Sequence, residues 1–152
     1  MIALDVETTG VSPRKHGILS IGAVDVTNPE HRFYAECRVW DGAHMSDEAF
    51  TINGFTREQA TDPAKQTEKE AIEAFIAWAG GIRDWTIVGQ NPSFDRDFLI
   101  EACDRADMQF PFAHRTLDTH TLAYMKIVQP PSSTPVHTII THTTLSLDGV
   151  LQ

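Results

Sequence analysis

The apolar segment 2–7 near the start of the chain is interrupted by two acids, Asp5 and Glu7. An unpaired carboxylate is costly to bury, so acids are rare within an apolar strand. Alternate side chains of a strand share a face, which places these two side by side. Like charges at that separation repel unless a cation lies between them. The spacing therefore predicts a divalent metal at the end of a buried strand; the alternative is an exposed edge strand with solvated acids.

The length of 152 residues suits a single domain, 1–152, with a sizeable core. No apolar run approaches the roughly 20 residues of a membrane span, and the early acids interrupt any signal peptide, so we expect no membrane partner and a cytoplasmic location. The net charge of −9 argues against a broad basic surface for nucleic acid, although a carboxylate cluster with bound cations can be locally positive. Cys37 and Cys103 have neither metal-type nor disulfide spacing, and we interpret them as reduced, buried thiols.

The pattern of apolar residues predicts an α/β fold. Three antiparallel strands come first, and a strand–helix–strand–helix pattern follows, which implies two parallel strands with right-handed crossovers. Together they make a five-stranded mixed sheet flanked by helices. The expected strands are 2–7, 17–26, 32–39, 86–89 and 115–118, and the expected helices are 46–51, 66–79, 92–105 and 119–127.

Local signals set the ends of several helices. Ser46 is the expected N-cap of the short helix, and Gly54 ends it. Pro92 suits the first turn of the helix that follows the fourth strand. The Pro- and Thr-rich stretch 129–144 is interpreted as a loop, and 144–148 as the start of a further helix.

A second acidic candidate, Asp95, lies one turn into the helix that begins at Pro92. Asp95 and Asp97 are about 200° apart around a helix, so they cannot serve the same site. Asp95 can face the sheet edge where the first strand ends. Asp97, with Arg96, is expected on the solvated face.

These segments together resemble the DEDD 3′–5′ exonuclease superfamily. Residues 5–10 (Asp-Val-Glu-Thr-Thr-Gly) are similar to its first motif and residues 91–95 (Asn-Pro-Ser-Phe-Asp) to its second. Residues 52–56 (Ile-Asn-Gly-Phe-Thr) resemble an element of the branch that contains ribonuclease T and the proofreading ε subunit of DNA polymerase III. Residues 116–119 and 145–148 also match typical segments. The resemblance implies a ribonuclease H-like fold, in agreement with the mixed sheet.

The resemblance also implies the chemistry. Two metal ions, Mg²⁺ or Mn²⁺, would hydrolyse a phosphodiester at the 3′ end of single-stranded DNA or RNA. Asp5 would bridge both metals, Glu7 would bind the metal that activates water, and Asp95 would hold the second. The expected substrate-binding residues are Thr8, Thr9, Gly10, Asn91 and Phe94. Phe94 and Phe98 could stack on bases; the alternative is that both belong to the core.

One motif of the superfamily is missing. A C-terminal helix should carry a histidine and, five positions later, an aspartate, as general base and metal ligand. None of the seven histidines of this chain has an aspartate at that spacing. His137 and His142 are candidate replacements, but solvated loop histidines are the usual case. The expectation is a C-terminally truncated domain without its last helices and without a general base.

Two hypotheses follow. The first is a 3′–5′ exonuclease that is weak or inactive in this form. The second is a non-catalytic remnant of the fold that acts as a nucleic-acid- or protein-binding module. Missing helices would also leave apolar surface exposed, which predicts self-association, for example as a homodimer.

Overall fold

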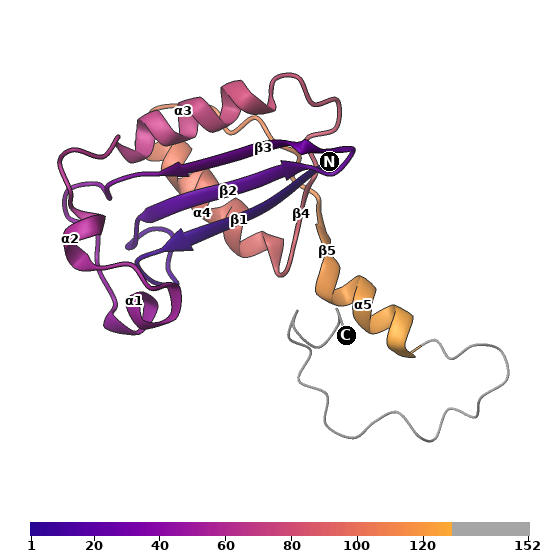
Figure 1. Cartoon of the computed structure of the whole chain (residues 1–152), viewed down its shortest axis with the longest axis horizontal. Helices are drawn as coiled ribbons and strands as arrows, with labels where there is room; N and C mark the ends of the chain where they lie inside the picture. The colour runs from indigo at the N-terminus through magenta and orange to yellow at the C-terminus, as the bar shows by residue number, and fades with distance from the viewer. Residues whose placement is uncertain (129–152) are drawn as a thin grey trace, which may run out of the picture.

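The computed structural model describes residues 1–128 and contains a five-stranded mixed sheet in the strand order β3-β2-β1-β4-β5 (Figure 1). Strands β1, β2 and β3 form an antiparallel meander, and β4 and β5 run parallel to β1. The strands are β1 Ile2–Thr8, β2 Ile18–Asp25, β3 Asn28–Glu36, β4 Ile87–Gly89 and β5 Thr116–Asp118. The predicted arrangement of three antiparallel and two parallel strands is therefore confirmed.

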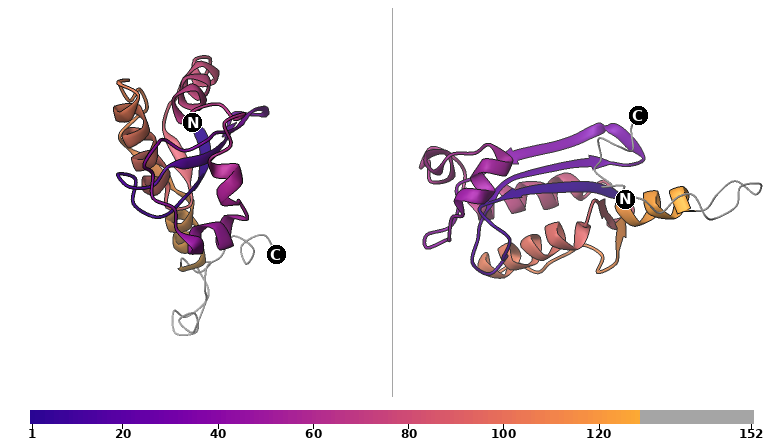
Figure 2. Two further views of the ribbon diagram at one scale, coloured as in Figure 1. Left: turned by 90° about the vertical axis from the view of Figure 1, so that its left-hand side faces the viewer. Right: turned by 90° about the horizontal axis from the view of Figure 1, so that it is seen from below.

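Five helices accompany the sheet within residues 1–128, and the two longest, α3 and α4, pack side by side on one of its faces (Figure 2). Their apolar stripes meet the buried side of β1 and β2 in a single core that includes Phe75 and Phe98. The helices are α1 Asp47–Asn53, α2 Arg57–Ala60, α3 Glu68–Ala79, α4 Pro92–Arg105 and α5 Thr119–Val128.

Strand β1 has two different faces, as its sequence requires. Leu4 and Val6 are buried against the helix layer, whereas Asp5 is exposed and Glu7 half-buried on the opposite face. Because alternate side chains of a strand point to opposite faces, the apolar positions fix the acids on the side away from α3 and α4.

The ends of most helices follow local sequence signals, although the N-cap side chains of α1 and α4 make no capping hydrogen bond. Thr67 and Glu70 form a reciprocal capping box at the start of α3, and Pro92 occupies the first turn of α4. Gly54 ends α1 in the left-handed conformation, with φ 75°. Ser46 is the N-cap residue of α1 as expected, but its side chain makes no capping hydrogen bond.

The predicted bounds of the third strand were wrong. The prediction was 32–39, with a turn from 27 to 31, whereas β3 runs from Asn28 to Glu36. The strand includes Pro29, which is tolerated because β3 is at the edge of the sheet, where a missing N–H breaks no ladder. The sequence analysis also missed α2, a single turn capped by Thr56 and Gln59. The predicted loop 129–144, the helix start at 144–148 and the candidates His137 and His142 lie outside the described residues.

Cys37 and Cys103 are buried free thiols, as predicted. Burial raises the pKa of Cys37 to about 12 and that of Cys103 to about 11, so both remain protonated at neutral pH.

Within residues 1–128, the structure contains no helix that is long and apolar enough to cross a membrane.

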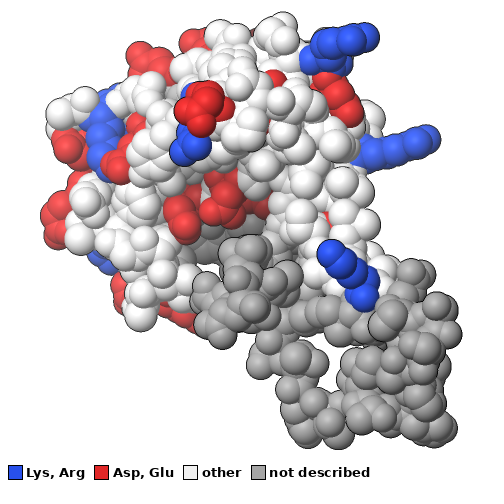
Figure 3. All heavy atoms as spheres, turned by 45° about the vertical axis from the view of Figure 1, so that its right-hand side comes forward, with Lys and Arg blue, Asp and Glu red and all other residues white. Residues whose placement is uncertain are grey.

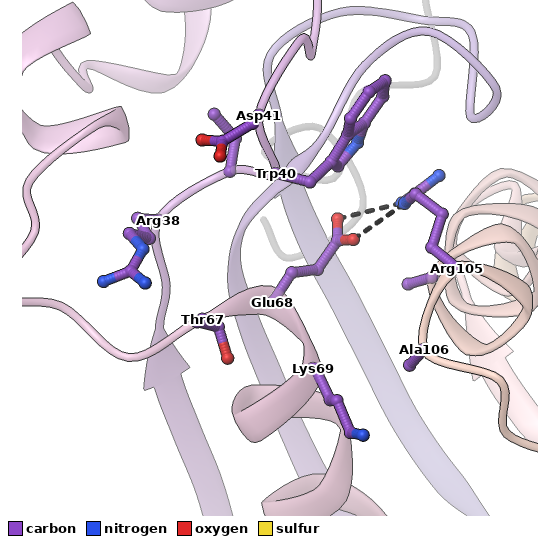
Figure 4. A pocket seen from close by; sticks show the side chains of 10 residues that line it. Arg38, Trp40, Asp41, Thr67, Glu68, Lys69, Arg105 and Ala106 are labelled. Carbon is purple, nitrogen blue, oxygen red and sulfur yellow. Dashed lines mark hydrogen bonds and ion pairs between the residues drawn. The ribbon is translucent and has the colours of Figure 1, made fainter.

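An ion pair between the buried Glu68 and the half-buried Arg105 joins the two helices of the layer to the loop between β1 and β2 (Figure 4). Arg105 of α4 donates two hydrogen bonds of 2.9 Å to the carboxylate of Glu68 in α3. The same guanidinium donates to the carbonyl oxygen of Pro13, and Glu68 accepts from the amide of Ile18. The pair therefore holds the middle of the loop at Pro13 and its junction with β2 at Ile18, and other residues of this loop line the cavity described below.

Candidate nuclease site

The carboxylates of Asp5 and Glu7 lie on the open face of the sheet, as the strand pattern predicts. Partial burial raises the pKa of Asp5. Desolvation and then the charge of Asp5 raise the pKa of Glu7. Both neighbouring acids are therefore harder to ionise than usual, and a bound cation would stabilise their ionised form.

Asp95 reaches β1 from the helix layer, beyond the end of β4. Strand β4 pairs only with Ile2 and Ala3 of β1, so the backbone of Val6 has no strand neighbour on that side. Its amide donates a 2.9 Å hydrogen bond to Oδ1 of Asp95. The structure thus brings the predicted third acid to the strand backbone between Asp5 and Glu7.

The carboxyl group of Asp95 is buried, with 3% of the residue exposed. Burial raises its pKa to about 6; the hydrogen bond from Val6 opposes that rise, and the charges of Asp5 and Glu7 add to it. The three acids therefore interact electrostatically although they come from two different elements. In Figure 3, acidic side chains gather in a hollow of the molecular surface.

The donor set is compatible with a hard divalent cation, because all three side chains offer carboxylate oxygens. Asp95 already uses Oδ1 for the Val6 amide, which leaves Oδ2 for a ligand. Among residues 1–128, however, no three His, Cys, Asp or Glu side chains form a ready-made metal-binding group. Metal binding at Asp5, Glu7 and Asp95 thus remains a prediction.

A cavity of about 440 Å³ lies beside Glu7 and has the size of a small-ligand pocket. Phe94 of α4 lines it, whereas Phe98 is fully buried in the core, 4.9 Å from Phe94 between ring centroids. Of the two phenylalanines considered for base stacking, only Phe94 is therefore placed to contact a ligand. The remaining lining residues are Val6, Thr8, Gly10, Val11, His16, Ser46, Glu48, Ala49, Ile52 and Asn53.

The segment from Thr8 to Gly10 forms one wall of this cavity and is held rigidly. The hydroxyl of Thr8 donates to the carbonyl oxygen of Gly10, and the side-chain amide of Asn53 donates to the carbonyl oxygen of Thr8. Thr9 is fully buried; its hydroxyl donates to the carbonyl oxygen of His44 and accepts from the amide of Gly17. The side chain of Thr9 thus anchors the loop, and only its backbone remains a candidate for substrate contact.

Asn91 lies apart from the other predicted substrate-binding residues. It precedes α4 in the left-handed conformation, with φ 53°, and its backbone N–H donates to the carboxylate of Asp118. It lines a second, broader groove on the open sheet face, which Asp5 also lines. Thr8, Gly10 and Phe94 line only the cavity beside Glu7, Asn91 lines only this groove, and the buried Thr9 lines neither.

Several further lining residues of the cavity were not predicted from the sequence, among them His16, Glu48 and Ile52. Glu48 is an acid in the first turn of α1, a position that by itself indicates no ligand contact. Ile52 lies in the 52–56 segment, which resembled a family element, and it is 79% exposed; that resemblance was the available signal in the sequence. His16 carried no recognisable motif.

The raised pKa of Asp95 predicts a pH-dependent stability. In the unfolded chain this carboxyl ionises near pH 3.8, and in the fold near pH 6. The contribution of Asp95 to the free energy of unfolding is therefore constant below pH 3.8, falls as the pH rises between these values, and stays lower above pH 6. At about 1.4 kcal/mol per unit, the ionised carboxylate costs the fold about 3 kcal/mol at neutral pH.

Asp95→Asn should consequently melt at a higher temperature than the wild-type chain at pH 7.5 in EDTA, and the difference should vanish towards pH 4. The substituted amide keeps the Oδ1 acceptor for Val6 and removes the charge. Added Mg²⁺ should raise the melting temperature of the wild type but not of the variant. Calorimetric melting curves from pH 4 to 8 test this, and an Asp95→Asn chain less stable at pH 7.5 would contradict it.

Comparison with known proteins shows the family of the chain. An exonuclease family model matches residues 2–139. Ribonuclease T of Yersinia pseudotuberculosis (strain IP 31758) is 29% identical over 147 residues, covering 84% of this chain and 66% of the relative; that of Yersinia enterocolitica is 28% identical with the same coverage. The chain thus spans about two thirds of the length of these relatives.

Solved structures of Escherichia coli exonuclease I share the fold. The zinc-bound complex with single-stranded DNA has a TM-score of 0.70 at 17% identity, covering 86% of this chain and 30% of the exonuclease. The complex with a dT13 oligonucleotide has a TM-score of 0.68 at 17% identity, with the same coverage. The family match over 2–139, together with this ribonuclease H-like fold, places the chain in the ribonuclease T-type exonuclease family of the DEDD superfamily.

Proposed function

We propose that this chain is a 3′–5′ exonuclease domain that removes nucleotides from single-stranded DNA or RNA with the help of Mg²⁺ or Mn²⁺. The observation that carries the proposal is the hydrogen bond between Asp95 and Val6, which brings an acid of α4 to the strand that bears Asp5 and Glu7. Family membership and the likeness to ribonuclease T support the reaction type.

In this proposal the acids bind the metal ions and the adjoining cavity binds the substrate. Asp5, Glu7 and Asp95 would hold two divalent ions, which supply water activation and stabilise the leaving 3′ oxygen. The adjoining cavity would take the 3′-terminal nucleotide, with Phe94 against the base and the Thr8–Gly10 backbone along the sugar. Rigid anchoring of that backbone would hold the scissile bond beside the acids.

Activity in the 152-residue form should be weak, and so should metal binding. The sequence has no histidine followed five positions later by an aspartate, so the family's general base and fourth acid have no counterpart. Fewer anionic ligands weaken divalent binding. Exposed apolar side chains on α5, such as Leu122 and Met125, would favour self-association of this form, as a homodimer in the simplest case.

The second candidate function is a non-catalytic binding module. The lack of a ready-made metal group among residues 1–128 favours it, because the fold and the cavity could still bind a single-stranded end without metal. The two candidates differ in metal dependence and in product formation.

A nuclease assay separates them. With a 5′-labelled single-stranded oligonucleotide and Mn²⁺, we expect slow, stepwise shortening from the 3′ end, and no product with EDTA. Asp5→Asn should abolish the reaction, because the substitution removes an anionic ligand while keeping the size of the side chain. Asp97→Asn is the matched control, since Asp97 pairs with Arg96 away from the site. Tight binding of the oligonucleotide without any shortening would instead establish the binding module.

A further inference from the structure

His16 is the one residue of the cavity wall that can present a ring N–H to a ligand. Its ring lies so close to Gly10 that a Cβ added there would be 2.4 Å from Nε2. Both residues line the cavity, so the Cδ2–Nε2 edge of the ring belongs to the wall formed with Gly10.

The other end of the ring is fixed by Ser12. Nδ1 lies 3.1 Å from both the amide nitrogen and the carbonyl oxygen of Ser12. The amide can only donate, so a neutral ring that accepts from it carries its proton on Nε2. A protonated ring donates from both nitrogens. A neutral ring that instead carries its proton on Nδ1 donates to the carbonyl oxygen of Ser12 and leaves Nε2 as an acceptor. In every form Nε2 is available to a ligand, because it has no hydrogen-bond partner among the described residues.

The remaining polar side chains of the cavity offer few other donors. Glu7 and Glu48 accept when ionised. Asn53 uses its amide group on the carbonyl oxygen of Thr8 and its oxygen on the amide of Phe55. The hydroxyl of Thr8 is used on Gly10. The hydroxyl of Ser46 makes no capping hydrogen bond and is the other side-chain donor of the wall. A nucleoside carries acceptors as well as donors, and Nε2 of His16 can pair with either, depending on where the ring carries its proton.

We propose that His16 is a substrate-binding residue that makes a hydrogen bond between Nε2 and a polar atom of the 3′-terminal nucleoside. This inference rests on the proposed function of the cavity as the site of the terminal nucleotide. The phosphate would be held at the acids, so the contact falls on the base or sugar. Loss of the contact should weaken binding and leave the chemical step intact.

Two substitutions distinguish the contact made by Nε2 from the contact made by Nδ1. His16→Asn places an acceptor near the position of Nδ1 and keeps the contact with Ser12, but has no group at Nε2. His16→Gln extends an amide N–H to the position of Nε2 and gives up the contact with Ser12. We expect His16→Asn to bind about 10-fold more weakly with an unchanged melting temperature. His16→Gln should bind within a fewfold of the wild type.

The measurement is fluorescence anisotropy with a 5′-fluorescein single-stranded pentanucleotide whose 3′-terminal linkage is a phosphorothioate. KM and kcat on the ordinary oligonucleotide accompany it, and we expect the change in KM alone. His31→Gln, whose ring packs on Trp78 outside the cavity, is the control and should leave both constants unchanged.

The outcomes are distinct. Wild-type affinity in His16→Asn would overturn the proposed contact while leaving the proposed function standing. Equal loss of affinity in both variants with lowered melting temperatures would assign His16 a purely structural role. A wild-type chain that fails to bind the oligonucleotide would overturn the proposed function and, with it, this inference.

Discussion

Continuing the chain after Gln152 with a helix that carries a histidine and, five positions later, an aspartate should raise its exonuclease rate by about 10²–10⁴-fold. General-base assistance alone accounts for a gain of this size, and the added aspartate restores an anionic metal ligand. No histidine of the present chain has an aspartate at that spacing. The acids that would work with the new pair, Asp5, Glu7 and Asp95, are already brought to one strand segment.

The matched control is the same extension with alanine at both positions. It covers the same surface of the domain, so any rescue that depends only on stability or solubility appears in both proteins. Initial rates with Mg²⁺ on a 5′-labelled single strand give the comparison. Rapid removal of 3′ nucleotides by the 152-residue chain, abolished by Asp5→Ala, would show that no extension is needed.

Much of the fold could be predicted because its signals are local. The alternation along β1, Pro92 at the start of α4 and Gly54 after α1 each depend on a few adjacent residues, and all three predictions are confirmed. The start of β3 was wrong because Asn28 and Pro29 favour turns in isolation. Only the position of β3 at the edge of the sheet makes them acceptable in a strand.

The parts of the candidate site that could be predicted are those that depend on the repeat of a single strand or helix. Strand spacing put Asp5 and Glu7 on a common face, and helix spacing separated Asp95 from Asp97. What Asp95 contacts depends on where β4 ends and leaves the Val6 amide free, which no local pattern contains. The separation of Asn91 from Phe94, three residues away, likewise follows from its left-handed backbone before α4.

The ion pair between Glu68 and Arg105 was not predicted either, and its loss should have the largest effect on stability. Arg105→Met should lower the free energy of unfolding by about 3–5 kcal/mol, because Glu68 would remain as a buried charge without its partner. For a chain of this length, that corresponds to a fall of about 6–20 °C in melting temperature. The methionine retains the apolar stem of the arginine, so the loss is mainly electrostatic.

Adding Glu68→Gln to Arg105→Met should recover most of this loss. The glutamine is uncharged, and its carbonyl oxygen can still accept from the amide of Ile18. Arg14→Met is the control, because the pair of Arg14 with Glu101 is exposed and should be worth less than about 1 kcal/mol. Urea titrations of the four proteins measure the differences. Equal losses in the Arg105 and Arg14 variants would mean that the buried pair does not stabilise the loop from Pro13 to Ile18, which forms part of the wall of the candidate site.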